Sequence, residues 1–193
     1  MNVYDFDNTI YKGDSTADFY MFCLKKHKKI ALLFPSLSIA FIKYYVLKIG
    51  NKTQFKENMY KFLRYCDIEN DLKEFWDSHS NNIKKWYLEQ KKDDDVIISA
   101  SPYFLLKPIG EKIGFFVIAS DVDKKSGKYN GVNCYYDEKV RRFFDIYPDG
   151  KIDEFYSDHY SDEPLANIAQ KAFIVEGNNI IDWDYNKHIK PRT

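Results

Sequence analysis

The sequence predicts an α/β protein with a Rossmann-like parallel sheet core and an inserted all-helical cap domain. Two observations support this prediction. After about residue 95, short apolar runs typical of buried strands alternate with helical stretches, and one more such run opens the chain. Between them, the apolar residues follow the helical period. We therefore assign residues 1–12 and 93–193 to the α/β core and residues 13–92 to the cap.

Composition narrows the class of protein. The chain has 193 residues, enough for a sizeable core with a smaller lobe. Lys and Arg together number 29, as do Asp and Glu, so we expect no nucleic-acid partner. The cysteines Cys23, Cys66 and Cys134 lack metal-ligand spacing, which indicates reduced thiols in a cytoplasmic protein. The acidic motif at Asp5 leaves no room for a secretory signal, so we expect the mature chain to begin at Met1.

The first half of the chain is predicted to hold one strand and then helices. Residues 1–5 form the strand, and a turn-rich segment follows it. Ser15 and Asp18 resemble a capping box at the start of the first helix. Residues 53–66 and 69–90 each place their apolar side chains on one helix face.

The second half alternates between strands and helices, with a loop or hairpin at 124–136. Strands are predicted at 96–101, 115–120, 152–158 and 172–177, and helices at 102–113, 137–146 and 162–170. Such alternation implies parallel pairing with right-handed crossovers. Ligands then collect at the carboxyl ends of the strands.

Acidic and hydroxyl side chains follow the predicted strand ends. These residues are Asp5, Asp7, Ser99, Ser101, Asp158 and Asp162. Three acidic groups at one sheet edge would repel each other unless a cation lay among them. Because no Cys or His pair accompanies the carboxylates, a hard, oxygen-binding ion such as Mg²⁺ is the natural candidate.

Four motifs, taken in order, resemble those of the haloacid dehalogenase superfamily of phosphatases. "DFDNT" resembles the first motif, Asp-x-Asp-x-Thr, and "VIISAS" the second; "YYDEKVRRF" resembles the third with its lysine, and "YSDHYSDEPL" the fourth with its acidic pair. The residues of the second and third motifs are most similar to those of the phosphoserine-phosphatase-like branch, including its lipid-phosphate members. The motifs span residues 3–165, and the helical insert lies where this family places a cap.

The resemblance implies a Mg²⁺-dependent phosphomonoester hydrolase that forms an aspartyl-phosphate. Asp5 would be the nucleophile, and Asp7 the general acid and then the general base for water. Mg²⁺ would be held by Asp5, the backbone carbonyl of Asp7 and Asp158. Asp162 would lie among these ligands or just behind them.

The resemblance also implies a phosphoryl-binding set. Ser99 would donate a hydrogen bond to the phosphoryl oxygens, and backbone N–H groups near Asn8 and Ala100 would add others. Ser101 competes with Ser99 for this task, and we favour Ser99 from its position in the motif.

Lys139 would balance the charge of the phosphoryl group and the nucleophile, with Lys128 as its competitor. We expect Thr9 to support the turn. A second "DWD", at Asp182 and Asp184, lacks a following Thr and a preceding apolar strand, so we expect it on the surface.

Lysines flank an apolar stretch within residues 25–49. The uncharged run between Lys29 and Lys43 is shorter than the roughly 20 residues of a membrane span, and Pro35 interrupts it. Two interpretations stay open. The stretch could be the hydrophobic centre of the cap with lysines on its rim, or a surface-lying segment attracted to anionic lipid. The second predicts a peripheral membrane contact and an amphiphilic substrate such as a lipid phosphate.

The substrate is expected to be a small or amphiphilic phosphate ester. Phosphoserine phosphatases carry an acidic residue after the first motif that recognises the substrate amine, whereas "YKGDST" has no glutamate there, which argues against serine phosphate. A dehalogenase is disfavoured because its chemistry needs neither the second carboxylate nor the Mg²⁺ ligands. From another class, the fold could serve as a phosphate-binding or regulatory module with little activity, but all the catalytic residue types are present.

Overall fold

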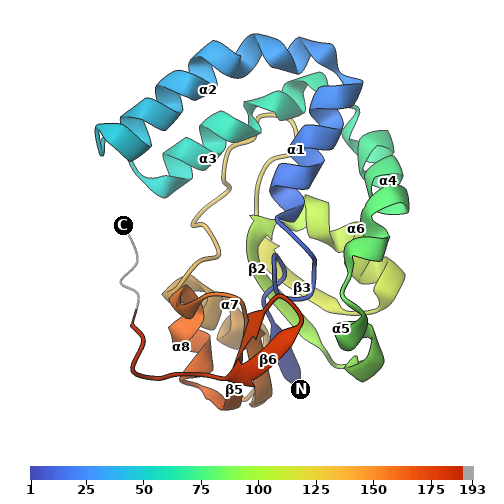
Figure 1. The fold of residues 1–193 in the computed structure, drawn as a ribbon, viewed down its shortest axis with the longest axis vertical. Coiled ribbons are helices and arrows are strands. Elements are labelled where there is room, and N and C mark those ends of the chain that lie inside the picture. The colour runs from blue at the N-terminus through green and yellow to red at the C-terminus, as the bar shows by residue number, and fades with distance from the viewer. Residues whose placement is uncertain (189–193) are drawn as a thin grey trace.

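The computed structural model describes residues 1–188 as a six-stranded sheet with helices on both faces and a helical lobe beyond its upper edge (Figure 1). The strand order is β3-β2-β1-β4-β5-β6, and only β6 runs antiparallel to its neighbour among the described strands. The strands are β1 (Asn2–Tyr4), β2 (Val96–Pro102), β3 (Phe116–Ser120), β4 (Ile152–Ser157), β5 (Ala169–Glu176) and β6 (Asn179–Asp182). The predicted α/β class with a largely parallel sheet is confirmed.

Helices fill the segment between β1 and β2. They are α1 (Ser15–Lys26), the 3₁₀ helix η1 (Lys28–Leu33), α2 (Phe34–Phe41), the π-helical turn η2 (Ile42–Val46), α3 (Lys52–Tyr60), the 3₁₀ helix η3 (Lys61–Tyr65), α4 (Ile68–His79), the 3₁₀ turn η4 (Ser80–Asn82) and α5 (Lys85–Gln90). In Figure 1, α2 and α3 lie side by side at the top of this lobe. The helices around the sheet are α6 (Tyr103–Ile113), α7 (Asp137–Ile146), η5 (Tyr160–Asp162) and α8 (Glu163–Ala166).

The alternation of side chains along the strands builds a separate core on each face of the sheet. Val3 and Phe155 point to the face that α7 and α8 cover. Their neighbours Tyr4 and Tyr156 point to the other face, where they stack at 4.8 Å between ring centroids and meet the aromatic side chains of the helical lobe. The central strands are therefore buried on both faces, which explains their continuous apolar runs.

The helical lobe differs from the sequence-based expectations at two points. Asp14, and not Ser15, caps α1, because the Asp14 side chain accepts a hydrogen bond from Ala17 N at 2.9 Å. The helix predicted over 69–90 is broken by η4. Just after η4, Lys84 N donates to Ile10 O at 2.7 Å and ties the chain back to the core.

The C-terminal part of the sheet also differs from expectation. The helix predicted over 162–170 ends at Ala166, because Ala169 already pairs with Ile152 of β4. The "DWD" segment is preceded by a strand after all, since β6 turns back at Gly177 with φ 65° to pair with β5. Because β6 is antiparallel, Asp182 at its carboxyl end lies away from the edge that Asp5 occupies, and it is exposed as expected.

Glycine is needed where the loop between β3 and α7 touches the helical lobe. Gly127 has φ 74°, and a Cβ there would lie 2.6 Å from the Cβ and 2.7 Å from the carbonyl oxygen of Tyr60. Gly131 in the same loop has φ 113°, but a Cβ there would meet nothing within 4 Å. The two glycines thus share the backbone constraint and differ in the contact.

We expect Gly127→Ala to lower the free energy of unfolding more than Gly131→Ala does. Both changes impose an unfavourable backbone conformation, worth about 1–2 kcal/mol. Only Gly127→Ala adds the clash with Tyr60, worth about another 1–3 kcal/mol. Urea unfolding followed by circular dichroism measures the difference, and equal losses in the two variants would contradict the contact.

Candidate active site

Three neighbouring strands bring their carboxyl ends to one cavity. β1 lies between β2 and β4, so Asp5 shares the cavity with Ser99 of β2 and with Asp158, which directly follows β4. Asp5 N continues the ladder by donating to Tyr156 O at 2.8 Å. The cavity measures about 340 Å³, and α1 and α3 of the helical lobe contribute to its wall through Thr16 and other side chains.

Lys139 joins two of the carboxylates. Its Nζ donates to Asp5 Oδ1 and to Asp162 Oδ2, both at 2.7 Å, and its side chain is only 2% exposed. Burial alone would lower the pKa of Lys139, but the contacts with Asp162 and Asp5 outweigh it and hold the pKa above its usual value. The lysine therefore stays protonated. Ser157 Oγ also donates to Asp162 Oδ2, at 2.8 Å.

Burial raises the pKa of Asp5, and its neighbours Asp162 and Asp158 add to that effect, whereas Lys139 opposes it. Burial and Asp162 likewise raise the pKa of Asp158. The carboxylates thus repel one another across the cavity, as the sequence predicted for acidic groups at one sheet edge. A positive charge among them is needed to keep them ionised together.

Asp7 lies in a different environment from Asp5. Its carboxylate accepts hydrogen bonds from Ser15 N at 2.6 Å and from the Ser101 hydroxyl at 2.5 Å. Burial, with the nearby Asp14, raises the pKa of Asp7 to about 6, although these hydrogen bonds act in the opposite direction. A carboxyl group with a pKa near neutrality exchanges a proton readily, which suits general acid and base catalysis.

The turn after Asp7 is fixed from two sides. Asn8 has φ 57°, in the left-handed region, and its carbonyl oxygen accepts a hydrogen bond from Lys84 of the helical lobe. Thr9 Oγ1 accepts a hydrogen bond from Asp158 N at 2.9 Å. Thr9 therefore supports the turn, as expected, and it also ties the first motif to the end of β4.

The two serines of β2 have different partners. Ser99 Oγ accepts from Ser101 N at 3.1 Å, and the Ser101 hydroxyl donates to Asp7. The hydroxyl hydrogen of Ser101 is thereby engaged, whereas Ser99 keeps its own for another acceptor. Both serines and Ala100 between them line the cavity. This arrangement supports the preference for Ser99 as the phosphoryl donor, which stays a prediction.

Sequence reasoning missed the cations of the helical lobe. Lys52 and Lys56 of α3 line the cavity, four residues apart and therefore on one helix face. Lys56 Nζ donates to Ala100 O at 3.2 Å, and Lys52 Nζ lies 4.0 Å from the centre of the Tyr135 ring. Burial, with Lys52 nearby, lowers the pKa of Lys56 to about 8. The spacing of these lysines was a visible signal, but only the fold shows what they face.

The competing lysine lies elsewhere, and a histidine beside Asp158 has a local structural role. Lys128, the competitor of Lys139, is exposed and lines a different pocket. His159 lines the cavity, and its Nδ1 accepts from Ser161 N at 3.1 Å, so it caps η5.

The donor chemistry of the cavity fits Mg²⁺. Asp5, Asp158 and Asp162 offer only oxygen atoms, which hard divalent cations prefer. Asp162 Oδ2 is already shared by Lys139 and Ser157, so its Oδ1 is the atom left for an ion. The mutual repulsion of these carboxylates is a second reason to place a cation there.

A tighter group of metal-ligand types lies in the helical lobe but is otherwise engaged. Cys23, Cys66 and Asp71 place one ligand atom each within 4.8 Å of one another. The Asp71 carboxylate already contacts Lys26 at 3.0 Å and His27 at 2.7 Å. Because both of its oxygens are paired with cationic or hydrogen-bonding groups, we assign no metal to this group.

Comparison with known proteins places these residues in a family context. A family model described as haloacid dehalogenase-like hydrolase matches residues 3–167. No curated protein matches the chain. Among solved structures, a Bordetella pertussis Tohama I protein of unknown function is 18% identical, with a TM-score of 0.70 over 89% of this chain and 87% of that one.

Two further structures share the fold. A phosphoserine phosphohydrolase-like protein from Francisella tularensis subsp. tularensis SCHU S4 is 17% identical, with a TM-score of 0.51 over 89% of this chain and 86% of that one. Cytosolic 5′-nucleotidase IIIB bound to cytidine is 14% identical, with a TM-score of 0.57 over 87% of this chain and 68% of that one.

Replacing Lys139, the lysine shared by Asp5 and Asp162, should destabilise the protein in a pH-dependent way. We expect Lys139→Met to cost about 3–5 kcal/mol at pH 8 in EDTA, because it leaves Asp5 and Asp162 buried without their partner. Burial already raises the pKa of Asp5, and the variant loses the opposing lysine. A folded-state pKa above the unfolded value removes stability as pH rises between the two values, so the loss should be smaller at pH 5.

Urea unfolding at both pH values measures this difference. Lys128→Met is the matched control, because that lysine is exposed in a loop, and we expect it to change the free energy of unfolding by less than about 0.5 kcal/mol. A Lys139→Met loss that is small, or that does not grow with pH, would contradict the shared ion pair.

Proposed function

The chain belongs to the haloacid dehalogenase-like hydrolases, and we propose that it is a Mg²⁺-dependent phosphatase that cleaves phosphomonoesters through an aspartyl-phosphate on Asp5. One observation carries this proposal. Two carboxylates separated by one residue enter the same cavity in different settings, Asp5 beside a buried lysine and Asp7 under two hydrogen-bond donors. One group suits attack on phosphorus and the other suits proton transfer.

In the first step, an oxygen of ionised Asp5 attacks the phosphorus atom and the bond to the leaving oxygen breaks. Protonated Asp7 transfers its proton to that oxygen, which departs as an alcohol. Lys139 offsets the negative charge that gathers between Asp5 and the phosphoryl group. Ser99 donates to a phosphoryl oxygen, with backbone N–H groups near Asn8 and Ala100.

In the second step, Asp7 is ionised and takes a proton from water as the water oxygen attacks phosphorus. The bond between phosphorus and Asp5 breaks, which releases phosphate and restores the carboxylate of Asp5. Asp7 is then protonated again and ready for the next substrate. The pKa of about 6 keeps both of its forms accessible near neutral pH.

Asp5, Asp158 and Asp162, with the backbone carbonyl of Asp7, are the groups that would hold Mg²⁺. The bound ion would screen the repulsion between an anionic nucleophile and an anionic substrate. Thr9 holds Asp158 in place through the backbone hydrogen bond described above.

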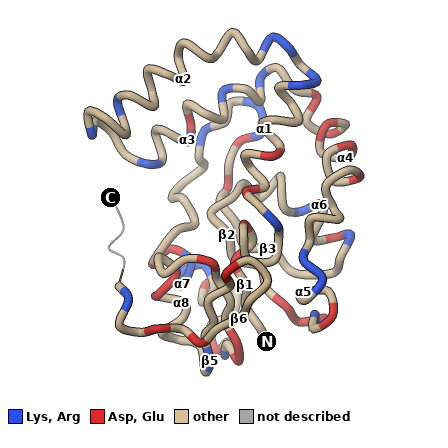
Figure 2. Tube along the Cα trace, viewed as in Figure 1, with Lys and Arg blue, Asp and Glu red and all other residues tan. Residues whose placement is uncertain are grey.

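We further propose that the protein, expected in the cytoplasm, docks on anionic membranes through residues 25–49. The helix over Lys28–Val46 has a mean hydropathy of 1.4 and is long and apolar enough, by length and composition alone, to cross a membrane, yet only 6% of it is buried. This exposure supports a surface-lying segment over the hydrophobic centre of the cap, although Ile30 within it is buried. Figure 2 shows the tube along α2 uncharged between basic stretches at its two ends.

Contacts with α3 favour a helix that lies on the surface. Tyr44 stacks on Phe55 of α3 at 5.2 Å between ring centroids, so one side of the helix belongs to the cap. A spanning orientation would draw Lys52 and Lys56 of α3 toward hydrocarbon, which is costly for charged groups. A surface-lying segment keeps these lysines at the catalytic cavity.

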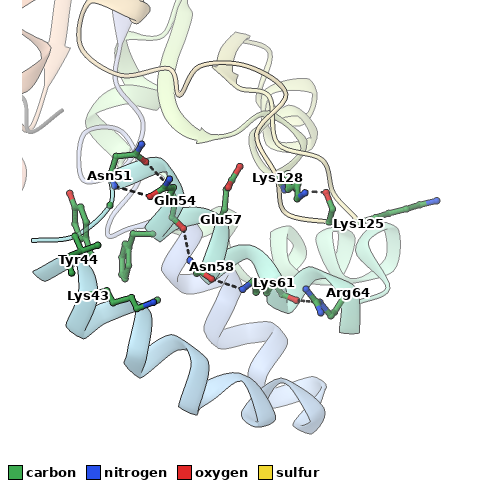
Figure 3. Close-up of a pocket in the computed structure, with 15 residues that line it drawn as sticks. Lys43, Tyr44, Asn51, Gln54, Glu57, Asn58, Lys61, Arg64, Lys125 and Lys128 are labelled. Atoms are coloured by element: carbon green, nitrogen blue, oxygen red, sulfur yellow. Dashed lines mark hydrogen bonds between the residues drawn. The ribbon is translucent and has the colours of Figure 1, made fainter. Parts of the chain in front are cut away.

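A basic pocket lies beside the far end of this segment. It measures about 780 Å³, and Figure 3 shows its lysines and arginine coming from three separate parts of the chain. Its charged residues are Lys43, Lys61, Arg64, Lys125 and Lys128, with Glu57 as the acidic member. Basic side chains beside an exposed apolar helix match a membrane surface that carries anionic lipid.

We expect Asp5→Asn to lower the turnover of p-nitrophenyl phosphate by at least about a thousandfold, because the amide cannot act as the nucleophile. Release of p-nitrophenolate measures the rate. Asp182→Asn is the matched control, since Asp182 belongs to the exposed second "DWD", and it should keep full activity.

Chelation with EDTA should remove the activity of the unaltered protein, and added Mg²⁺ should restore it. Substantial turnover by Asp5→Asn would rule out the nucleophile. A folded protein with no Mg²⁺-dependent hydrolysis of any phosphate ester would instead favour the phosphate-binding module.

The membrane contact is tested by sedimentation with vesicles. The protein should bind vesicles that contain anionic lipid, and the double change of Leu32 and Ile39 to Ser should weaken binding by about tenfold or more, because both side chains are exposed on the helix. Ile146→Ser, an exposed isoleucine at the end of α7, serves as the control. Equal binding to neutral and anionic vesicles, or none to either, would contradict the proposal.

A further inference from the structure

An apolar groove of about 490 Å³ runs between α2 and α3 on the helical lobe. Of the side chains that line it, only those of Ser38 and Tyr20 carry polar atoms. The lining residues are Tyr20, Phe34, Leu37, Ser38, Phe41, Ile42, Phe55 and Met59. Phe34, Phe41 and Ile42 are each about half exposed, so the groove is accessible to a ligand.

The groove and the catalytic cavity share part of their walls. Phe55 and Met59 of α3 line both spaces. Tyr45 lines the cavity and packs on Phe41 of the groove at 4.7 Å and on Phe55 at 5.4 Å, measured between ring centroids. A molecule whose phosphate lies at Asp5 would meet this aromatic wall first and the groove beyond it.

The side chains of α3 change character across this boundary. Lys52 and Lys56 form a cationic stripe that faces the cavity, and Phe55 and Met59 form an apolar stripe beside it. Neighbouring cationic and apolar stripes on one helix complement a ligand with an anionic head and a hydrocarbon tail. A small polar substrate would fill the cavity and leave the groove empty.

We infer that the groove is a binding subsite for a single hydrocarbon chain of the substrate, so that the phosphatase acts on amphiphilic phosphomonoesters. This inference rests on the proposed function. The phosphate lies at Asp5 with the lysines of α3 nearby, and the chain passes over Phe55 and Met59 into the groove. The groove is lined by α2, the helix proposed to lie on the membrane, which would give a hydrocarbon chain a short path from lipid to the site.

The test compares n-alkyl phosphates of increasing length, from butyl to decyl phosphate, each below its micelle concentration. Phosphate release with Mg²⁺ gives kcat/KM. We expect it to rise by about twofold to fourfold for each methylene that the groove buries, and then to level off. Ser38→Trp fills the groove and should abolish the ratio between decyl and butyl phosphate within that variant.

Ser36→Trp is the matched control. Ser36 lies two residues before Ser38 on α2, is exposed and does not line the groove, so this variant should keep the ratio between decyl and butyl phosphate. Loss of the ratio in both variants would point to a general effect on α2 and overturn the subsite. A ratio that survives in Ser38→Trp, with vesicle binding lost instead, would assign the groove to the membrane and also overturn it.

Calorimetric titration of Asp5→Asn with butyl and decyl phosphate measures the subsite without turnover. Decyl phosphate should bind more tightly, and adding Ser38→Trp should remove the difference. If decyl phosphate binds in this way but the unaltered protein hydrolyses no ester, the subsite stands and the phosphatase proposal fails. If short esters are hydrolysed and chain length changes neither binding nor rate, the phosphatase proposal stands and the subsite fails.

Discussion

The bridge from Lys139 to Asp5 and Asp162 is the interaction on which the rest of the site depends. Parallel strands deliver several carboxylates to one sheet edge, and burial there makes their shared ionisation unfavourable. A protonated lysine between two of them lowers that cost while leaving oxygens free for other partners. The lysine comes from α7, so the packing of this helix against the sheet sets the charge balance at Asp5.

Much of this arrangement could be predicted because it follows from strand topology. Apolar runs in the sequence locate β1, β2 and β4. Because the carboxyl ends of parallel strands lie at one edge of a sheet, the convergence of Asp5, Ser99 and Asp158 follows from the sequence pattern alone. The same reasoning failed where two structural signals compete for the same residues. Asp14 displaced Ser15 as the cap of α1, and pairing with β4 made a strand of Ala169 where a helical pattern continued.

The cap shows what periodicity leaves undetermined. The pattern over 53–66 located an amphipathic helix. Helical periodicity shows which side chains share one face of a helix, but not which part of the molecule that face contacts. The pattern places Phe55 and Met59 among the core residues, but both are half-buried and line the active-site cavity and the apolar groove. The lysines on the adjacent stripe of α3 also line the active-site cavity. The sequence around α2 is likewise compatible with a buried centre or with an exposed surface, and only its burial in the fold distinguishes them.

The chemistry and the choice of substrate therefore rest on different parts of the chain, and α3 connects them. In the proposed reaction, the sheet edge would supply groups that any phosphomonoester needs, since they would act on the phosphorus and its oxygens. Part of the cavity wall is made by α3, whose lysines line the same cavity as the carboxylates and whose apolar stripe also lines the groove beside α2. Lys56 spans this junction, because its Nζ bonds to Ala100 O in the second motif. A ligand that contacts both the cationic and the apolar stripe of α3 would hold the helical lobe against the sheet edge. Recognition of the leaving group would then favour closure of the lobe over Asp5.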